Sequence, residues 1–143
     1  IDGTIDCIAS DPSPSTAELK LLDTGDFGAA WGGISSLQLG LSLVWTEAAK
    51  RGIELAEVVR WMSAAPAAVA RVADKGAIVA GNDADFAVFA ADEEWTVHAT
   101  DLYHRNQISA YDSRTVRGRV TQTLLRGVPV DFETPAGRLL RAH

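Results

Sequence analysis

The sequence predicts an α/β fold with helices in its first half and strands in its second half. Up to about Ala73, apolar residues recur mainly at helical spacing, whereas beyond Gly76 short β-type runs alternate with turn residues. One apolar run, residues 5–9, precedes the helices and has the length of a buried strand. We therefore expect a first unit at residues 1–73 and a second unit at residues 74–143.

The apolar run at residues 5–9 leads into Asp11, which is followed by Pro12 and Pro14. An apolar run that is broken by prolines is typical of a buried strand that ends in a loop. In parallel α/β folds the chemistry lies at the carboxyl ends of the strands, so Asp11 is a candidate catalytic or metal-binding residue. Aspartate before proline also commonly caps a turn, and the pattern alone leaves both interpretations open.

A short helix is expected at residues 17–22, and residues 22–33 then form a loop rich in glycine and aspartate. Trp31 is an apolar anchor of this loop, and Gly32 and Gly33 follow it directly. Because glycine has no Cβ, a ligand could approach the backbone closely there. The alternative is a plain turn that leads into the next helix.

Helices are the clearest local prediction. An apolar stripe from Ser36 predicts a helix that ends near Lys50, because Gly52 follows basic residues as expected at a helix end. A second helix is predicted by apolar residues at i, i+3, i+4 and i+7, namely Leu55, Val58, Val59 and Met62. Pro66 fits the first turn of a third, short helix that ends near Ala73.

Strands are expected in the second unit at residues 78–80, 86–90 and 95–98, with a turn at residues 81–83. Residues 119–125 and 128–132 flank Arg126 and Gly127 and predict a hairpin, in which Pro129 favours an edge position. Four arginines in this region could bind an anion, but a solvated strand face is the favoured interpretation. They are Arg114, Arg117, Arg119 and Arg126.

Composition narrows the class of protein. With 143 residues, a net charge of −6 and 47% hydrophobic residues, the chain suits one soluble globular unit. The acidic balance argues against a nucleic-acid partner, and the single cysteine, Cys7, excludes an internal disulfide. No segment has the pattern of a membrane span or a signal peptide, so we expect a cytoplasmic protein without a membrane partner. Because the chain starts at Ile1, directly before a predicted strand, we expect it to be a segment of a longer protein.

Several motifs, taken in order, resemble the C-terminal part of the allantoinases, a cyclic-amidase branch of the amidohydrolase superfamily that also holds dihydroorotases and dihydropyrimidinases. The motifs are Ser10-Asp11-x-Ser13-Pro14, Trp31-Gly32-Gly33-Ile34-Ser35-Ser36-Leu37-Gln38, Val59-Arg60-Trp61-Met62-Ser63, Gly81-Asn82-Asp83-Ala84-Asp85 and His104-Arg105-Asn106. The resemblance implies that residues 1–73 are the last strand and C-terminal helices of a (β/α)₈ barrel. Residues 74–143 would then be the C-terminal part of a composite β-sandwich.

The implied activity is the metal-dependent hydrolysis of allantoin, a cyclic ureide, to allantoate. The resemblance assigns Asp11 as a metal ligand and as the group that moves the proton, and it places Ser13 and Trp31 to Gly33 at the substrate. It implies a divalent metal, zinc, in a binuclear centre whose other ligands are a His-x-His pair, a lysine and two further histidines. All of these lie upstream of this segment. A homotetramer is also implied.

Two departures from the family pattern limit this assignment. Pro12 stands where the allantoinase pattern carries histidine, which removes an imidazole and a backbone donor. The three histidines, His98, His104 and His143, have no His-x-His spacing, and one carboxylate cannot assemble a hydrolytic zinc site. We therefore expect the isolated segment to be inactive. A non-catalytic relative or scaffold, or a cyclic amidase of the dihydropyrimidinase or dihydroorotase type, remains the alternative.

Overall fold

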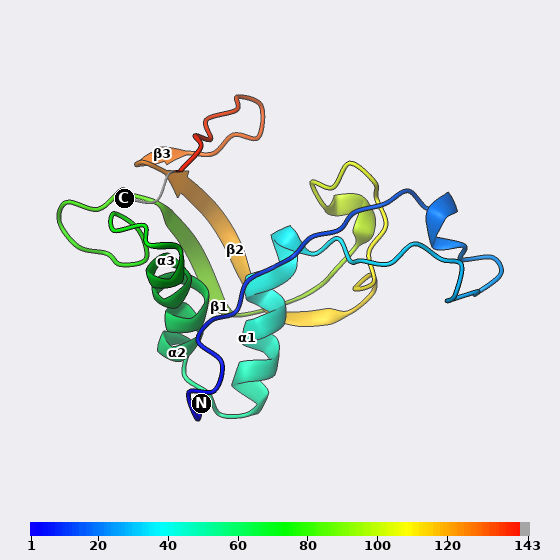
Figure 1. Ribbon diagram of the computed structural model, residues 1–143, viewed down its shortest axis with the longest axis horizontal. Helices are drawn as coiled ribbons and strands as arrows, with labels where there is room; N and C mark the ends of the chain where they lie inside the picture. Colours follow the sequence, from blue (N-terminus) through cyan, green and yellow to red (C-terminus); the bar gives the residue numbers. More distant parts are fainter. Residues whose placement is uncertain (141–143) are drawn as a thin grey trace.

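The computed structural model describes residues 1–140, in which helices cover one face of a small antiparallel sheet (Figure 1). The α/β class is therefore confirmed for these residues, whereas the last residues of the predicted second unit, His143 among them, lie outside the described part. The helices and strands are α1 (Gly40–Lys50), α2 (Leu55–Val59), α3 (Ala65–Ala70), β1 (Phe86–Thr96), β2 (Thr115–Leu125) and β3 (Val128–Pro129). Short 3₁₀ turns occupy Glu18–Lys20, Leu37–Leu39 and Ala99–Asp101.

Helix α1 confirms the prediction from the apolar stripe. It follows the 3₁₀ turn Leu37–Leu39 and ends at Lys50, where Gly52 adopts a left-handed conformation with a φ of 68°. The Gly52 amide donates to the Ala49 carbonyl at 3.0 Å, and the Ile53 amide donates to the Ala48 carbonyl at 3.0 Å. These two bonds satisfy carbonyls that the helix end would otherwise leave free.

The second and third predicted helices are one continuous helical segment. A π-helical turn at Arg60–Ala64 joins α2 to α3, and Pro66 lies in the first turn of α3. Proline cannot donate a backbone hydrogen bond and its ring crowds the carbonyl four residues earlier, so a wider turn accommodates it. The helix ends at Ala70 rather than near Ala73, because Arg71 adopts a left-handed conformation with a φ of 56°.

The sheet has the order β1-β2-β3 and is antiparallel throughout. The segments predicted at 86–90 and 95–98 are parts of one strand, β1, whose register against β2 shifts between Ala90 and Glu94. The predicted hairpin around Arg126 and Gly127 is confirmed, although β3 is only two residues long. Residues 78–80 are irregular and lead into a turn, so the strand prediction there was wrong.

The two arginines within β2 pair with acidic side chains of β1; Arg119 is exposed, as favoured from sequence, whereas Arg117 is partly buried. Arg117 pairs with Asp92 at 2.5 Å, and Arg119 pairs with Glu93 at 3.1 Å. Both carboxylates belong to the irregular stretch of β1, so the bulge places acidic side chains opposite the basic ones of β2. Ion pairs of this kind, near the surface, contribute little to stability.

The predicted strand at residues 5–9 is not a strand in the structure. The Ile8 amide donates to the Trp61 carbonyl at 2.9 Å, but Ile5 is 77% exposed. A strand needs a neighbouring strand with which to exchange hydrogen bonds, and the sheet of residues 1–140 consists only of β1, β2 and β3. The helix predicted at 17–22 is also shorter than expected: it is a single 3₁₀ turn, Glu18–Lys20, which ends at left-handed Leu21.

Two apolar clusters join the predicted units into one packed body. One contains Leu39, Val97, Leu102 and Val116, and the other contains Trp45, Ala48 and Val58 with Phe89 packed against it. Each cluster therefore combines side chains from α1 or its preceding turn with side chains of other elements. No helix within the described residues is both long and apolar enough to cross a membrane.

A turn around residues 81–85 anchors the far end of the sheet. The Lys75 ammonium pairs with the carboxylates of Asp83 and Asp85. Its hydrogen bond holds the pKa of Asp85 below the ordinary value for aspartate, against the opposing effect of burial. The same Asp85 carboxylate accepts the Arg126 amide at 2.7 Å, so the turn is tied to the β2–β3 hairpin.

Candidate functional site

The candidate site lies in the irregular part of the chain, where two loops meet. The first loop carries Asp11, Pro12 and Ser13, and the second carries Trp31 to Gly33. The Ser13 amide donates to the Ile34 carbonyl at 3.0 Å, which fixes the two loops against each other. The structure therefore brings together two parts of the chain that sequence reasoning had assigned to substrate.

Gly33 lies so close to Ser13 that no larger residue fits. Gly33 has a φ of 86°, and a Cβ built on it would lie 2.2 Å from the Ser13 Cβ and 2.8 Å from the Ser13 carbonyl oxygen. Glycine is needed there for both reasons, the left-handed conformation and the close approach of the two chain segments. The group that approaches Gly33 closely in the structure is therefore Ser13, and the approach of a ligand to this backbone stays a prediction.

Lys20 binds the carbonyl groups of the second loop. Its ammonium donates hydrogen bonds to the carbonyls of Trp31 at 3.0 Å, Gly32 at 3.1 Å and Gly33 at 2.6 Å. The Trp31 amide in turn donates to the Leu19 carbonyl at 2.8 Å. Sequence reasoning missed Lys20, because one lysine in a short helical candidate carries no signal of a contact to carbonyls eleven to thirteen residues away.

The His104-Arg105-Asn106 motif lies against the same loops. The Ser35 hydroxyl and the His104 Nδ1 are 3.0 Å apart, and His104 Nε2 is buried without a partner among the described residues. Arg105 and Asn106 line a hollow together with Trp31, whose side chain is 61% exposed. Residues of both predicted units therefore contribute to the surroundings of the loop 31–35.

Asp11 stands apart from any group that could hold a metal with it. Its side chain is exposed, and residues 1–140 contain no cluster of three or more histidine, cysteine, aspartate or glutamate side chains that could bind a metal ion. A hydrolytic zinc centre needs three protein ligands and an open position. The described residues therefore do not fit a complete metal centre. Asp11 supplies at most one ligand.

The arrangement can bind a polar ligand through backbone groups and offers one free carboxylate. Ser13, Lys20 and Gly33 line a small cavity of about 200 Å³ together with Ile108 and Ser109. Hydroxyl and backbone groups of this kind fix the orientation of a small neutral ligand. Asp11 is not among the residues that line this cavity.

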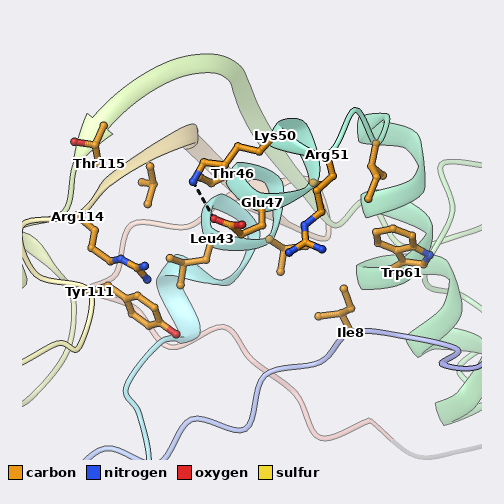
Figure 2. A pocket seen from close by; sticks show the side chains of 14 residues that line it. Ile8, Leu43, Thr46, Glu47, Lys50, Arg51, Trp61, Tyr111, Arg114 and Thr115 are labelled. Carbon is orange, nitrogen blue, oxygen red and sulfur yellow. Dashed lines mark hydrogen bonds and ion pairs between the residues drawn. The ribbon is translucent and has the colours of Figure 1, made fainter. Parts of the chain in front are cut away.

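A larger hollow lies elsewhere, between α1 and the segment that leads into β2. Figure 2 shows it with Ile8 and Trp61 on one side and Tyr111 and Arg114 on the other. The Glu47 carboxylate at its wall is paired with Lys50 at 2.9 Å. None of the predicted site residues lines this hollow.

Comparison with known proteins places the chain among hydrolases. Residues 2–130 match the Amidohydrolase family. The chain is 55% identical over 143 residues to an allantoinase of Streptomyces avermitilis, an alignment that covers 97% of this chain and 32% of that protein. It is 40% identical to an allantoinase of Arabidopsis thaliana, covering 89% of this chain and 26% of that protein. The chain thus spans about a third or less of the length of these curated relatives.

Solved structures agree with this placement. The fold superposes on an L-hydantoinase (dihydropyrimidinase) from Arthrobacter aurescens with a TM-score of 0.82 at 27% identity, over 98% of this chain and 31% of that one. It superposes on a D-hydantoinase (dihydropyrimidinase) from Thermus sp. with a TM-score of 0.77 at 26% identity, over 87% of this chain and 28% of that one. The family match covers nine-tenths of the sequence. The two allantoinases and the two solved structures agree with it. The chain belongs to the Amidohydrolase family.

Proposed function

We propose that this chain is the C-terminal part of a metal-dependent cyclic amidohydrolase that opens the ring of allantoin to give allantoate. The observation that carries the proposal is the 55% identity to the Streptomyces avermitilis allantoinase over nearly the whole chain. Because the chain spans 32% of that protein, the activity belongs to a full-length protein that carries this segment.

The proposed architecture is also that of a cyclic amidohydrolase. Residues 1–73 are the last strand and C-terminal helices of a (β/α)₈ barrel, and residues 74–143 are the C-terminal part of a β-sandwich. In support, the helices end at Ala70 and the first strand begins at Phe86. Residues 5–9 would gain their strand partners from the rest of the barrel.

Asp11 is the proposed catalytic residue of the segment. The family is generally metal-dependent, and Asp11 would contribute one ligand to a divalent metal centre, with zinc as the proposed metal and all further ligands supplied from outside residues 1–140. The Asp11 carboxylate accepts a proton from the attacking water and returns it to the ring nitrogen that leaves. Its exposure and its freedom from ion pairs in the described residues suit a group that must exchange protons.

Ser13, Trp31, Gly32 and Gly33 are the proposed substrate-binding residues. A cyclic ureide carries carbonyl oxygens and ring N–H groups but no fixed charge, so backbone amides, carbonyls and a hydroxyl are its natural partners. The full-length protein is proposed to be a cytoplasmic homotetramer that acts on a small molecule.

The first alternative is a cyclic amidase with a different ring preference, which the two hydantoinase (dihydropyrimidinase) folds favour. The discriminating experiment assays the full-length protein, with its metal content measured, on allantoin, hydantoin, dihydrouracil and dihydroorotate. We expect kcat/KM to be highest for allantoin. A higher value for one of the other rings would replace the assignment, and no turnover of any ring by metal-loaded protein would favour a non-catalytic scaffold.

The isolated 143-residue chain is expected to bind no catalytic metal and to hydrolyse no allantoin, because the described residues contain no metal-binding cluster. The measurement is the content of zinc, cobalt and manganese after dialysis, together with an assay for allantoate. Stoichiometric retained metal combined with turnover would contradict this expectation.

Changing Pro12 to histidine in the full-length protein is expected to raise activity several-fold. The resemblance places an imidazole at this position, and a regained hydrogen bond to substrate is worth about 1 kcal/mol. The neighbouring contact should survive the change, since it uses the amide of Ser13 and not that of residue 12. Kinetics of Pro12→His beside Pro12→Ala separate the two effects of removing the ring and adding the imidazole. Equal rates for both variants would rule out a role for the imidazole.

A further inference from the structure

We propose that Lys20 is a positioning residue, whose ammonium fixes the loop Trp31 to Gly33 in the conformation that presents its backbone amides to substrate. The inference rests on the proposed function, since it assigns a supporting group to the same site. It starts from the hydrogen bonds that Lys20 donates to the three successive carbonyls of Trp31, Gly32 and Gly33.

Lys20 adds three hydrogen bonds to a loop in which two successive residues are glycines. Gly32 and Gly33 are exposed and sample more backbone conformations than any other residue type would. A lysine ammonium has three donor hydrogens, and the three carbonyls take one each. The Lys20 side chain is partly buried, so its charge faces these carbonyls at reduced solvent screening.

The direction of the three carbonyls determines the direction of the amides. The peptide bonds of the described residues are all trans, and in a trans peptide the N–H points opposite to the C=O of the same unit. With the carbonyls of Trp31, Gly32 and Gly33 turned toward Lys20, the amides of Gly32, Gly33 and Ile34 point away from it. None of these amides donates to another group within residues 1–140, so each remains available to a ligand.

The lysine charge also strengthens these donors. A cation on the carbonyl side polarises each peptide unit, which makes the N–H on its other side a better donor. Because the three carbonyls converge on one ammonium, the three amides diverge, so one amide at a time can donate to the oxygen of a ring carbonyl, on which negative charge grows as water attacks. Lys20 therefore acts on substrate through the backbone, without contact to the reacting atoms.

The experiment uses the full-length protein with the variants Lys20→Met and Lys20→Arg. A matched control is Lys50→Met, which removes the same charge from an exposed pair with Glu47 on α1. For each protein, kcat and KM for allantoin are measured. Amide hydrogen exchange is followed at Trp31 and Ser13, whose amides donate to Leu19 and Ile34 and so report whether the loop is held.

We expect Lys20→Met to lower kcat/KM by about 10²-fold, as a displaced catalytic loop does, and to speed exchange of the Trp31 amide. Lys20→Arg should recover part of the rate because it keeps the cation, and Lys50→Met should behave like the parent. The inference is overturned by parent-like kinetics of Lys20→Met, by an Arg variant as impaired as the Met variant, or by exchange that rises equally across the whole chain. If the parent itself hydrolyses no cyclic ureide, the proposed function fails, and unchanged Trp31 exchange in Lys20→Met would separately refute the positioning role.

Discussion

Replacing Asp11 with asparagine in the full-length protein is expected to lower kcat for allantoin by about 10²- to 10⁴-fold, the usual contribution of a positioned acid–base group. Asparagine keeps the size and shape of the side chain but cannot accept the proton. The fold should be unaffected, because Asp11 is exposed and belongs to no ion pair of the described residues. The measurement is turnover at saturating allantoin, with metal content and thermal stability determined for each sample.

Asp6→Asn is the matched control. Asp6 is also an exposed carboxylate of the N-terminal segment, five positions before Asp11, and it has no proposed role. Its removal changes the net charge equally, so a shared loss would point to electrostatics of the segment and not to chemistry. Parent-level turnover of Asp11→Asn with full metal occupancy would remove Asp11 from the mechanism, and its loop would then be a simple turn.

Local patterns predicted helix α1 and the hairpin well. Helix α1 and its glycine end depend on residues within a few positions of one another, so the apolar stripe and Gly52 contain the necessary information. The β2–β3 turn at Arg126 and Gly127 is local for the same reason. The π-helical turn Arg60–Ala64 was missed because proline is read as a helix start or break, although a widened turn lets the helix continue through it.

Features that depend on distant parts of the chain were not predictable. The strand expected at residues 5–9 has the right composition, but a strand forms only when another strand lies beside it. Lys20 reaches its three carbonyls through a loop whose path no periodicity encodes. For the candidate site, the resemblance predicts Ser13 and Gly33 as neighbours of substrate, which stays a prediction, whereas the contact between the two residues emerged only from the structure.

Gly118→Ala is expected to destabilise the segment strongly. Gly118 is buried in β2 with a φ of 86°, and a Cβ there would lie 2.2 Å from a ring carbon of Phe89 and 2.6 Å from one of Trp45. The Trp95 indole donates to the Gly118 carbonyl at 3.0 Å, so the backbone cannot move away freely. Overpacking and left-handed strain together should cost about 2–5 kcal/mol of the free energy of unfolding.

Gly127→Ala separates the two contributions to that cost. Gly127 has a φ of 79°, but a Cβ added to it would only meet Ala84 at 3.8 Å, an ordinary contact. The control should therefore lose only the backbone contribution of about 1–2 kcal/mol. Urea unfolding of the full-length protein, followed by tryptophan fluorescence, measures both variants against the parent. If the two substitutions cost the same, the rings of Phe89 and Trp45 can move aside, and the close packing of α1 on the sheet at Gly118 does not contribute to stability as argued.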